Sequence, residues 1–463
     1  MIAEFLNRAV VLQQIDDLVS EMPRQITDER GQGRAADDLE HARAALAAAA
    51  DVERRGSSGQ LGFEPPDVRR GQEAPPLDDF SFISHQPIIS IVQSALEANY
   101  RRSELAGLVI DRPPADDRRG DGLPLVAEQS MASAPRVRRT DNGRRLFDQF
   151  SITDIRWVNS KIAEAIRFFR HKHAFNERPA EPVSLPDPCR LIVVGDWATG
   201  IPRARALGDV MRSEVSKALD EGLTTHVVHL GDVYYSGWEH EYRERLLDPW
   251  PVFADEADRV GSWTLNGNHD MYSGGHSYYN VALADPRFSQ QQRSSFFSLV
   301  HPKWKILAVD TSWEDADLRD PQTRWLRDEL HDKRKVMLLS HHQIFSAYDS
   351  YATAVAEKVA PILAARPIDA WFWGHEHRCI TYAPHLNVKC ARCVGHGGVP
   401  VYMWHGQNDP YPAPGAYEDR RFIASGLEHW AYFGFVVLDI KGDTIDVRYV
   451  DETANEHHSE IIA

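Results

Sequence analysis

Short apolar segments alternate with helical stretches in the C-terminal part of the chain. Each segment is apolar at nearly every position, which is the pattern of strands buried on both faces in α/β proteins. Each also runs into a polar residue of a type that binds metals. The segments are residues 190–194 before Asp196, 226–230 before Asp232, 304–309 before Asp310, 335–340 before His341 and 370–373 before His375. Sites gather at the carboxyl ends of strands in open α/β sheets, so the pattern predicts a site there.

The first part of the chain has helical patterns instead. Residues 1–55 contain a run of helix formers, and residues 88–110 and 146–173 carry apolar side chains at helical spacing. Residues 56–80 and 111–145 are rich in glycine, proline and charged residues, which indicates loops or linkers.

The composition changes at residues 182–188, where three prolines precede the first apolar segment. We therefore expect a mainly α-helical N-terminal region over residues 1–181, of unknown function, and an α/β domain over residues 182–463. Near the C-terminus, two apolar stretches flank Gly442 and Asp443, which predicts a β-hairpin.

The composition describes an acidic globular protein. The chain has 463 residues, of which 43% are apolar, and its 68 acidic and 52 basic side chains give a formal charge of −16. Nucleic acids and anionic membranes attract basic surfaces, so we expect neither as a partner. Glu4 and Arg8 argue against a signal peptide, and no segment has the roughly 20 apolar residues of a spanning helix. With only four cysteines, we expect a cytoplasmic protein without a disulfide framework.

Five short segments carry candidate metal ligands. Carboxylate, amide, imidazole and phenolate groups together suit Fe, Mn, Zn or Mg better than a soft metal, and one carboxylate can bridge two ions. Glycine beside a ligand lets the backbone turn sharply after a strand. The segments are Gly195-Asp196-Trp197-Ala198, Gly231-Asp232-Val233-Tyr234-Tyr235, Gly267-Asn268-His269-Asp270, Ser340-His341-His342 and Gly374-His375-Glu376-His377.

In this order, the five segments resemble the calcineurin-like metallophosphoesterases, and among them most closely the purple acid phosphatases. The resemblance covers about residues 188–463, and the ordered set is much more specific than any one segment. It implies a metallophosphoesterase-like fold, a two-sheet α/β sandwich with helices outside (αββα). It also implies that a centre of two metal ions hydrolyses phosphate esters.

The resemblance further implies a role for each matching residue. One ion would be held by Asp196, Asp232, Tyr235 and His377, and the other by Asp232, Asn268, His341 and His375. Asp232 would bridge the two. A metal-bound hydroxide would attack phosphorus, and His269, oriented by Asp270, would act as general acid or as a hydrogen-bond donor.

The first segment departs from the family pattern. Most calcineurin-like enzymes have Asp-x-His there, with the histidine as a ligand, whereas this chain has Ala198 at that position. Tyr235, three residues after Asp232, stands where purple acid phosphatases place a phenolate. Because a phenolate favours a trivalent ion, we expect Fe(III) beside Tyr235, and Fe(II), Zn or Mn in the other site.

Several other residues of metal-binding type have two interpretations. His276 and His342 are either substrate-binding or structural, and His229, inside an apolar segment, is best explained as a core histidine.

Three cysteines lie close together in the sequence. Cys390 and Cys393, with Cys379 and His396 nearby, have partial zinc spacing, but a second Cys-x-x-Cys pair is absent. We favour ordinary buried thiols over a zinc site.

The sequence thus predicts a dinuclear-metal hydrolase of small-molecule phosphate esters, with phosphomonoesterase activity favoured. A phosphodiesterase, for example of a cyclic nucleotide, would use the same metal core and is the alternative. An alternative of another class is a partner-binding protein, whose N-terminal helices bind a protein and whose phosphoesterase core is regulatory or inert.

Overall fold

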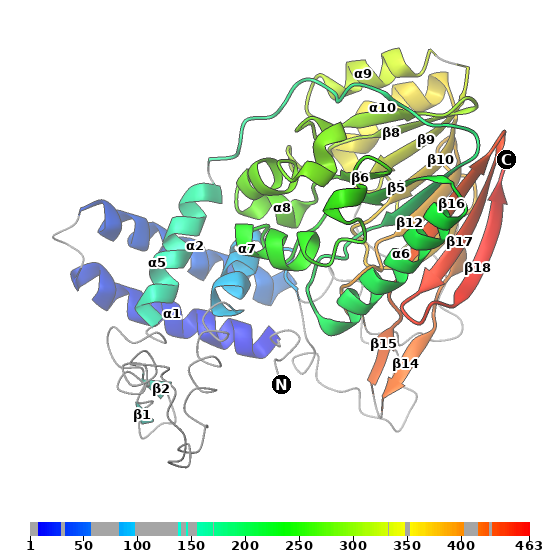
Figure 1. Cartoon of the computed structure of the whole chain (residues 1–463). Coiled ribbons are helices and arrows are strands. Elements are labelled where there is room, and N and C mark those ends of the chain that lie inside the picture. The colour runs from blue at the N-terminus through cyan, green and yellow to red at the C-terminus, as the bar shows by residue number, and fades with distance from the viewer. Residues whose placement is uncertain are drawn as a thin grey trace, which may run out of the picture. The chain divides into compact units, whose positions relative to one another are not determined.

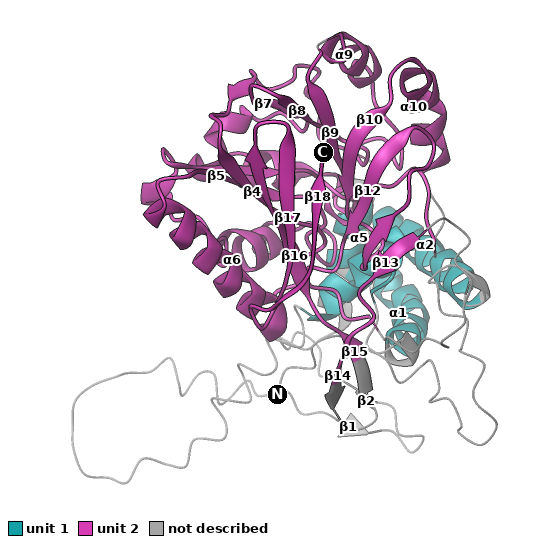
Figure 2. Cartoon of the chain, turned by 90° about the vertical axis from the view of Figure 1, so that its right-hand side faces the viewer, with its two compact units in different colours: residues 1–55, 77–170 teal, residues 56–76, 171–463 magenta. Residues whose placement is uncertain are grey.

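The computed structural model describes residues 8–28, 33–56, 83–97, 138–139, 145–146, 155–169, 171–331, 333–347, 352–401, 415–425 and 428–463. The chain divides into two compact units (Figure 2). The first consists of residues 1–55 and 77–170, and the second of residues 56–76 and 171–463. Most of the expected linkers, residues 57–80 and 111–137, lie outside the described residues.

The first unit is mainly helical, as the sequence predicted. Its described elements are α1 (Arg8–Asp28), α2 (Arg34–Gly56), a helix that includes residues 87–97, the strand pair β1 (Arg138–Arg139) and β2 (Arg145–Leu146), and α5 (Ile155–Phe169). In α1, the fully buried Val11, Ile15, Leu18 and Met22 repeat at intervals of three and four residues and so share one helix face. They form one core with apolar side chains of the other helices.

The second unit contains two large sheets with helices outside them (Figure 1). The order of the first sheet is β13 (Gly415–Glu418), β11 (Cys379–Tyr382), β12 (Val388–Val394), β10 (Ile368–Trp373), β9 (Lys335–Ser340), β8 (Trp304–Ala308), β7 (Phe297–Val300) and β3 (Val183–Ser184). The order of the second is β18 (Glu456–Ile462), β17 (Thr444–Asp451), β16 (Gly434–Lys441), β4 (Cys189–Val194), β5 (Thr224–His229) and β6 (Val260–Thr264). This confirms the expected two-sheet α/β sandwich.

Helices cover the outer faces of both sheets. Helix α6 (Pro202–Asp220) lies outside the six-stranded sheet, and α9 (Gln322–Glu329) and α10 (Thr353–Ala365) lie outside the eight-stranded sheet (Figure 2). The shorter elements are α7 (Glu239–Glu241), η3 (Tyr242–Leu247), η4 (Ala254–Glu256), α8 (Asn268–Tyr272), η5 (Tyr278–Ala282), η6 (Pro286–Gln291) and the hairpin β14 (Phe422–Ser425) and β15 (Glu428–Ala431).

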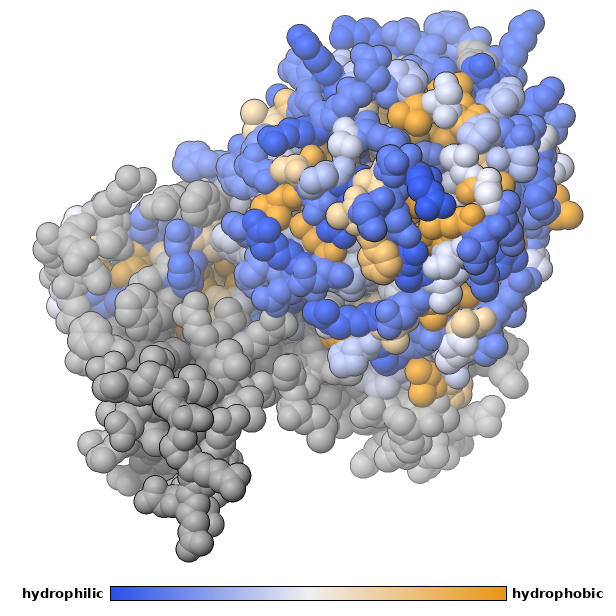
Figure 3. All heavy atoms as spheres, viewed as in Figure 1, coloured by the Kyte–Doolittle hydropathy of each residue, from blue (hydrophilic) through white to orange (hydrophobic). Residues whose placement is uncertain are grey.

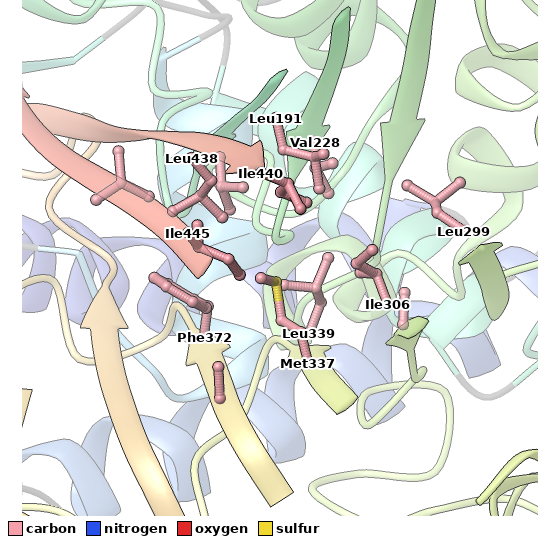
Figure 4. Close-up of a cluster of buried hydrophobic side chains, with 14 of the residues drawn as sticks. Leu191, Val228, Leu299, Ile306, Met337, Leu339, Phe372, Leu438, Ile440 and Ile445 are labelled. Atoms are coloured by element: carbon pink, nitrogen blue, oxygen red, sulfur yellow. The ribbon is translucent and has the colours of Figure 1, made fainter. Parts of the chain in front are cut away.

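Central strands such as β9 and β10 are buried at nearly every position because each of their faces contributes to a different core. Met337 and Leu339 of β9 point into the core between the sheets, which we call the inner core (Figure 4). Leu338 points the other way, into a core beneath α9 and α10, which we call the outer core. Side chains alternate between the faces of a strand, so a strand covered on both sides carries no polar face.

The C-terminal strands close the six-stranded sheet. β16 pairs antiparallel with β17 and also with β4, and Gly442, at φ +56°, lies in the hairpin turn. The predicted hairpin is therefore confirmed.

The face of the second unit that Figure 3 shows is largely hydrophilic. On the face shown in Figure 3, hydrophobic residues form small patches among hydrophilic ones. No helix among the described residues has both the length and the apolar character needed to cross a bilayer.

Candidate metal centre

The predicted ligands follow strands of both sheets. Because β4, β5 and β6 run parallel, their carboxyl ends lie at one edge of their sheet, and the same holds for β9 and β10 in the other sheet. The residues after these five strands, in that order, are Asp196, Asp232, Asn268, His341 and the pair His375 and His377. The structure brings all six into one cluster, since hydrogen-bond distances connect residues of the two sheets.

One half of the cluster contains an amide oxygen and two imidazole nitrogens. Oδ1 of Asn268 lies 3.0 Å from Nε2 of His341 and 3.1 Å from Nδ1 of His375. The two ring nitrogens lie 3.3 Å from each other. Ligands that bind one ion at about 2.0–2.2 Å are separated by about 3.0–3.5 Å, so these three atoms have the spacing of ligands to one ion.

The other half contains two carboxylates, an imidazole and a phenol. The hydroxyl of Tyr234 lies 2.8 Å from Asp196 Oδ1, 3.0 Å from Asp232 Oδ2 and 2.9 Å from His377 Nε2. His377 Nε2 is 3.5 Å from Asp196 Oδ1. Asp232 Oδ2 is also 3.5 Å from His341 Nε2, so Asp232 lies between the two halves.

The tyrosine at this position is Tyr234, whereas the ligand predicted from the sequence was its neighbour Tyr235. The backbone amide of Tyr235 donates to Glu241, and its carbonyl oxygen lies 2.6 Å from Nδ1 of His269. Ala198, at the position of the missing family histidine, accepts the backbone N–H of Tyr234 at 3.1 Å. This pairing brings Tyr234 beside Asp196. The signal in the sequence was the Tyr-Tyr pair, which leaves the choice between neighbours open.

Buried negative charge concentrates in this half. Burial and the charges of Asp196 and Asp270 raise the pKa of Asp232 well above its usual value. Burial alone would raise the pKa of Asp196, but His377, His341 and Tyr234 hold it below its usual value. Burial and both carboxylates raise the pKa of Tyr234. Such a group favours cations, which stabilise carboxylates and phenolates as anions.

The backbone at the ligands adopts a conformation that is rare for residues other than glycine. Asp196, Asp232, His375 and His377 have φ values of 57°, 74°, 68° and 53°. Such strain is found where the surrounding structure imposes it, often at functional sites. Gly267 leaves the space that Asp232 needs, because a Cβ there would lie 2.0 Å from Asp232 Oδ1.

The contacts of His269 and Asp270 differ from the expected pair. His269 Nδ1 lies 2.6 Å from the carbonyl oxygen of Tyr235, so that carbonyl orients the ring. Asp270 instead accepts the backbone N–H groups of Gly267, Asp232 and Val233, and burial raises its pKa to about 6. Asp270 therefore holds the loop of Asp232 rather than the imidazole.

Two further hydrogen bonds orient ligands of the other half. The side-chain amide of Asn268 donates to the hydroxyl of Tyr272 at 2.6 Å, which turns Oδ1 toward the histidines. Nδ1 of His341 lies 3.0 Å from the carbonyl of Leu230, so Nε2 faces Asn268. Outer partners of this kind are usual for metal ligands. Tyr272 has no sequence signal of its own.

A buried ion pair supports the loop that carries Tyr234. The carboxylate of Glu241 accepts the backbone N–H groups of Tyr235, Ser236 and Trp238. Arg245 lies 3.6 Å from Glu241 and donates to the carbonyl of Tyr234. Burial would raise the pKa of Glu241, but the charges of Arg245 and His240 and the N–H groups of Trp238 and Ser236 lower it. Neither Glu241 nor Arg245 was predicted from the sequence.

The two candidate substrate-binding histidines, His342 and His276, differ in burial and in their partners. His342 is buried, its ring centroid is 4.5 Å from that of His375, and its Nδ1 lies 3.0 Å from the hydroxyl of Thr311. His276 is partly exposed, and its Nε2 lies 2.7 Å from the carbonyl of His171.

His229 lies in the interior of β5. Its Nδ1 is 3.3 Å from the hydroxyl of Thr264, and burial lowers its pKa to about 3. It is therefore a neutral core histidine.

The donor set fits two cations. Among the described residues, the ion pairs of Asp196 and Asp232 are with histidines, not with lysine or arginine. A buried group of carboxylates without a basic partner is costly, and oxygen and imidazole donors suit transition metals. Asp196, Asp232 and His341 offer ligand atoms within 4.8 Å of one another.

Comparison with known proteins gives both a family and structural neighbours. The family model for calcineurin-like phosphoesterases matches residues 189–379, which include every predicted ligand. No curated protein sequence matches the chain.

Three solved structures illustrate the structural similarity. GAP50, the anchor in the inner membrane complex of Plasmodium, is 12% identical, with 60% of this chain and 89% of that chain covered and a TM-score of 0.46. A dimetal phosphatase from Danio rerio is 14% identical, with 60% of this chain and 99% of that chain covered and a TM-score of 0.39. A single mutant of Vps29 from Entamoeba histolytica is 14% identical, with 59% of this chain and 98% of that chain covered and a TM-score of 0.27.

The family match agrees with the two-sheet fold and with the ordered ligand segments. Residues 189–379 form a calcineurin-like phosphoesterase domain, and the chain is a metal-dependent phosphoester hydrolase.

Proposed function

We propose that this chain hydrolyses phosphate monoesters at a centre of two metal ions. The observation that carries the proposal is one largely buried cluster of two carboxylates, an amide oxygen and three imidazoles. In the proposal, one ion is held by Asp196, Asp232, His377 and a tyrosine, and the other by Asp232, Asn268, His341 and His375. When bound, the ions supply an activated water and positive charge for the phosphoryl oxygens.

His269 is the proposed proton or hydrogen-bond donor. With Nδ1 directed to the carbonyl of Tyr235, Nε2 lies on the opposite side of the ring. The ring is packed between Tyr234 and Tyr272, with centroid distances of 4.5 and 4.7 Å. This packing holds the imidazole in one orientation, which a donor to the leaving oxygen requires.

The reaction class is tested with a substrate panel. We expect the purified protein to hydrolyse an aryl phosphate monoester faster than an aryl phosphodiester or a cyclic nucleotide. A chelator should abolish turnover, and added Fe, Zn or Mn should restore it. Faster turnover of the diesters would establish the phosphodiesterase alternative, and turnover that resists complete metal removal would reject the dinuclear centre.

The His269→Ala variant tests the proposed donor. We expect kcat to fall by about 10²–10³-fold, the usual loss for one positioned donor. Metal content should stay at the wild-type level, because the backbone N–H of residue 269, which donates to Asp232 at 2.9 Å, is retained. His331→Ala, at an exposed histidine, is the matched control. Equal kcat in both variants would remove His269 from the mechanism.

The Fe(III) assignment predicts a coloured protein, because a phenolate bound to Fe(III) absorbs visible light. The contacts of Tyr234 with Asp196, Asp232 and His377 make it the preferred phenolate. We expect Tyr234→Phe to lose the visible band and Tyr235→Phe to retain it. The reverse result would restore Tyr235, and a colourless, fully active protein with two Zn or Mn ions would reject Fe(III).

A protein partner of the first unit remains a prediction from the sequence. That unit has its own apolar core, which supports an independent role. Comparing residues 171–463 with the full chain tests it: unchanged turnover would make the first unit accessory to hydrolysis, and a pull-down with the first unit would seek its partner.

A further inference from the structure

A second group of residues of metal-binding type lies beside the centre. Cys379 begins β11, His396 follows β12, and His457 lies on β18 of the other sheet. One ligand atom of each lies within 4.8 Å of the others. The three come from separate segments and from both sheets, so folding alone brings them together.

All three side chains are buried. Cys379 is 2% exposed, His396 is 3% exposed and the side chain of His457 is 3% exposed. Within the described part of the chain, neither ring nitrogen of His396 has a hydrogen-bond partner, and the same is true of Nε2 of His457. Since buried polar atoms nearly always have a partner, three such nitrogens beside a thiol point to a missing ligand.

The local backbone directs His457 into this group. Tyr449 pairs with His458 and Val450 with Glu456, so His457 is the extra residue of a bulge in β18. Bulges change the direction of a side chain. Nδ1 of His457 lies 3.0 Å from the hydroxyl of Tyr417, which leaves Nε2 for the cluster. Histidines that bind metals usually have such a partner on the second nitrogen.

A fourth donor and a small hollow complete the arrangement. Oδ2 of Asp419 lies 3.6 Å from Nε2 of His457, and the backbone N–H of Asp419 donates to the carbonyl of Cys379. The Asp419 carboxylate also accepts two hydrogen bonds from Arg421, each 2.9 Å long. Cys379, His396 and Asp419 line a hollow of about 10 Å³, which also touches His377. Such a volume holds about one water molecule or ion.

We propose that Cys379, His396 and His457 bind one zinc ion, with Asp419 or a water molecule as the fourth ligand. Cysteine thiolate and histidine imidazole are both ordinary zinc ligands, and structural zinc is almost always held tetrahedrally by four such donors. The charges also balance. The negative groups are the Cys379 thiolate and the carboxylates of Asp419 and Asp451, and the positive ones are the divalent ion and Arg421. Arg421 lies 2.9 Å from Asp451. The ion joins the start of β11, two residues after His377, to β18 in the other sheet, and so fixes the segment that carries His377.

The proposed site differs from the Cys-x-x-Cys pattern in the sequence. Cys390 and Cys393 are three residues apart on β12 and therefore face opposite sides of the sheet. Cys390 packs against the inner core, and Cys393 lies in the outer core. They cannot bind the same ion, and Cys390 provides a matched control.

Cobalt spectroscopy of the full chain tests the proposal. The residues proposed for the dinuclear centre contain no sulfur, so a thiolate-to-Co(II) charge-transfer band reports only a cysteine site. After chelation and reloading with Co(II), the wild type should show this band and bind three ions per chain. The band should persist in Cys390→Ser. It should also persist in Asp232→Ala, whatever happens to hydrolysis, which separates this site from the proposed function.

Two variants remove ligands of the site. Cys379→Ser should lose the band and one ion per chain, and His457→Gln should weaken Co(II) binding at this site by at least tenfold, with folding followed by circular dichroism. If Cys379→Ser does not fold, His457→Gln decides, because it retains the sulfur. If the hollow contains only water, the wild type should bind two Co(II) ions and show no sulfur band. That result would overturn the proposal. Wild-type Co(II) affinity in His457→Gln, or loss of the band in Cys390→Ser, would also overturn it.

Discussion

Replacing Asp232 with alanine is expected to lower kcat/KM for an aryl phosphate by about 10⁴-fold or more. Asp232 lies between the two halves of the cluster, with Oδ2 3.0 Å from the Tyr234 hydroxyl and 3.5 Å from Nε2 of His341. A shared carboxylate affects both ions, and each ion is worth several kcal/mol of transition-state stabilisation. A combined loss of about 6 kcal/mol corresponds to about 10⁴-fold in rate. Steady-state kinetics with metal analysis measures both effects.

The fold should survive this change. Asp232 contributes to a polar cluster rather than to a hydrophobic core, and removing one of several buried carboxylates lowers their mutual repulsion. Asp209→Ala, an exposed carboxylate on α6, is the control and should keep full activity. Full activity of Asp232→Ala, with both ions retained, would contradict the proposed centre.

Replacing Arg245 with methionine is expected to lower the free energy of unfolding by about 3–5 kcal/mol, the usual cost of breaking a buried ion pair. The side chains of Arg245 and Glu241 are 1% and 0% exposed, so the change leaves a buried carboxylate without its cation. The same carboxylate holds three backbone N–H groups of the loop that carries Tyr234. Denaturant unfolding measures the loss, and activity should fall with it.

The neighbouring pair of Arg243 and Glu239 is the matched control. Its atoms lie 2.9 Å apart, but its side chains are 61% and 63% exposed. Arg243→Ala should therefore change stability by about 1 kcal/mol or less. If both variants lose similar stability, the burial of the Arg245–Glu241 pair does not add to the stability of the fold.

Much of the fold follows from the sequence because its signal is local. Strands apolar on both faces, such as residues 335–340, require cover on both sides, and this predicts an α/β sandwich. The helical first unit is equally local, since the spacing of Val11, Ile15 and Leu18 defines one helix face. The ordered ligand segments identify the family for the same reason, because each is a short motif at the end of a strand.

Only the tertiary structure determined which of two adjacent residues faces the cluster and which partners a side chain contacts. The sequence placed a tyrosine near Asp232, but whether Tyr234 or Tyr235 faces the cluster depends on a loop held by Glu241 and Ala198. The family resemblance also implied that Asp270 orients His269, whereas the structure directs Asp270 to backbone N–H groups.

The same limit explains the group of Cys379, His396 and His457. Nothing in the sequence around His457 indicates a metal ligand, since its position depends on a bulge in β18 and on a contact between the two sheets. Local sequence determines periodicity, turns and strand ends. Contacts between distant segments depend on strand register and sheet packing, which only the folded chain defines.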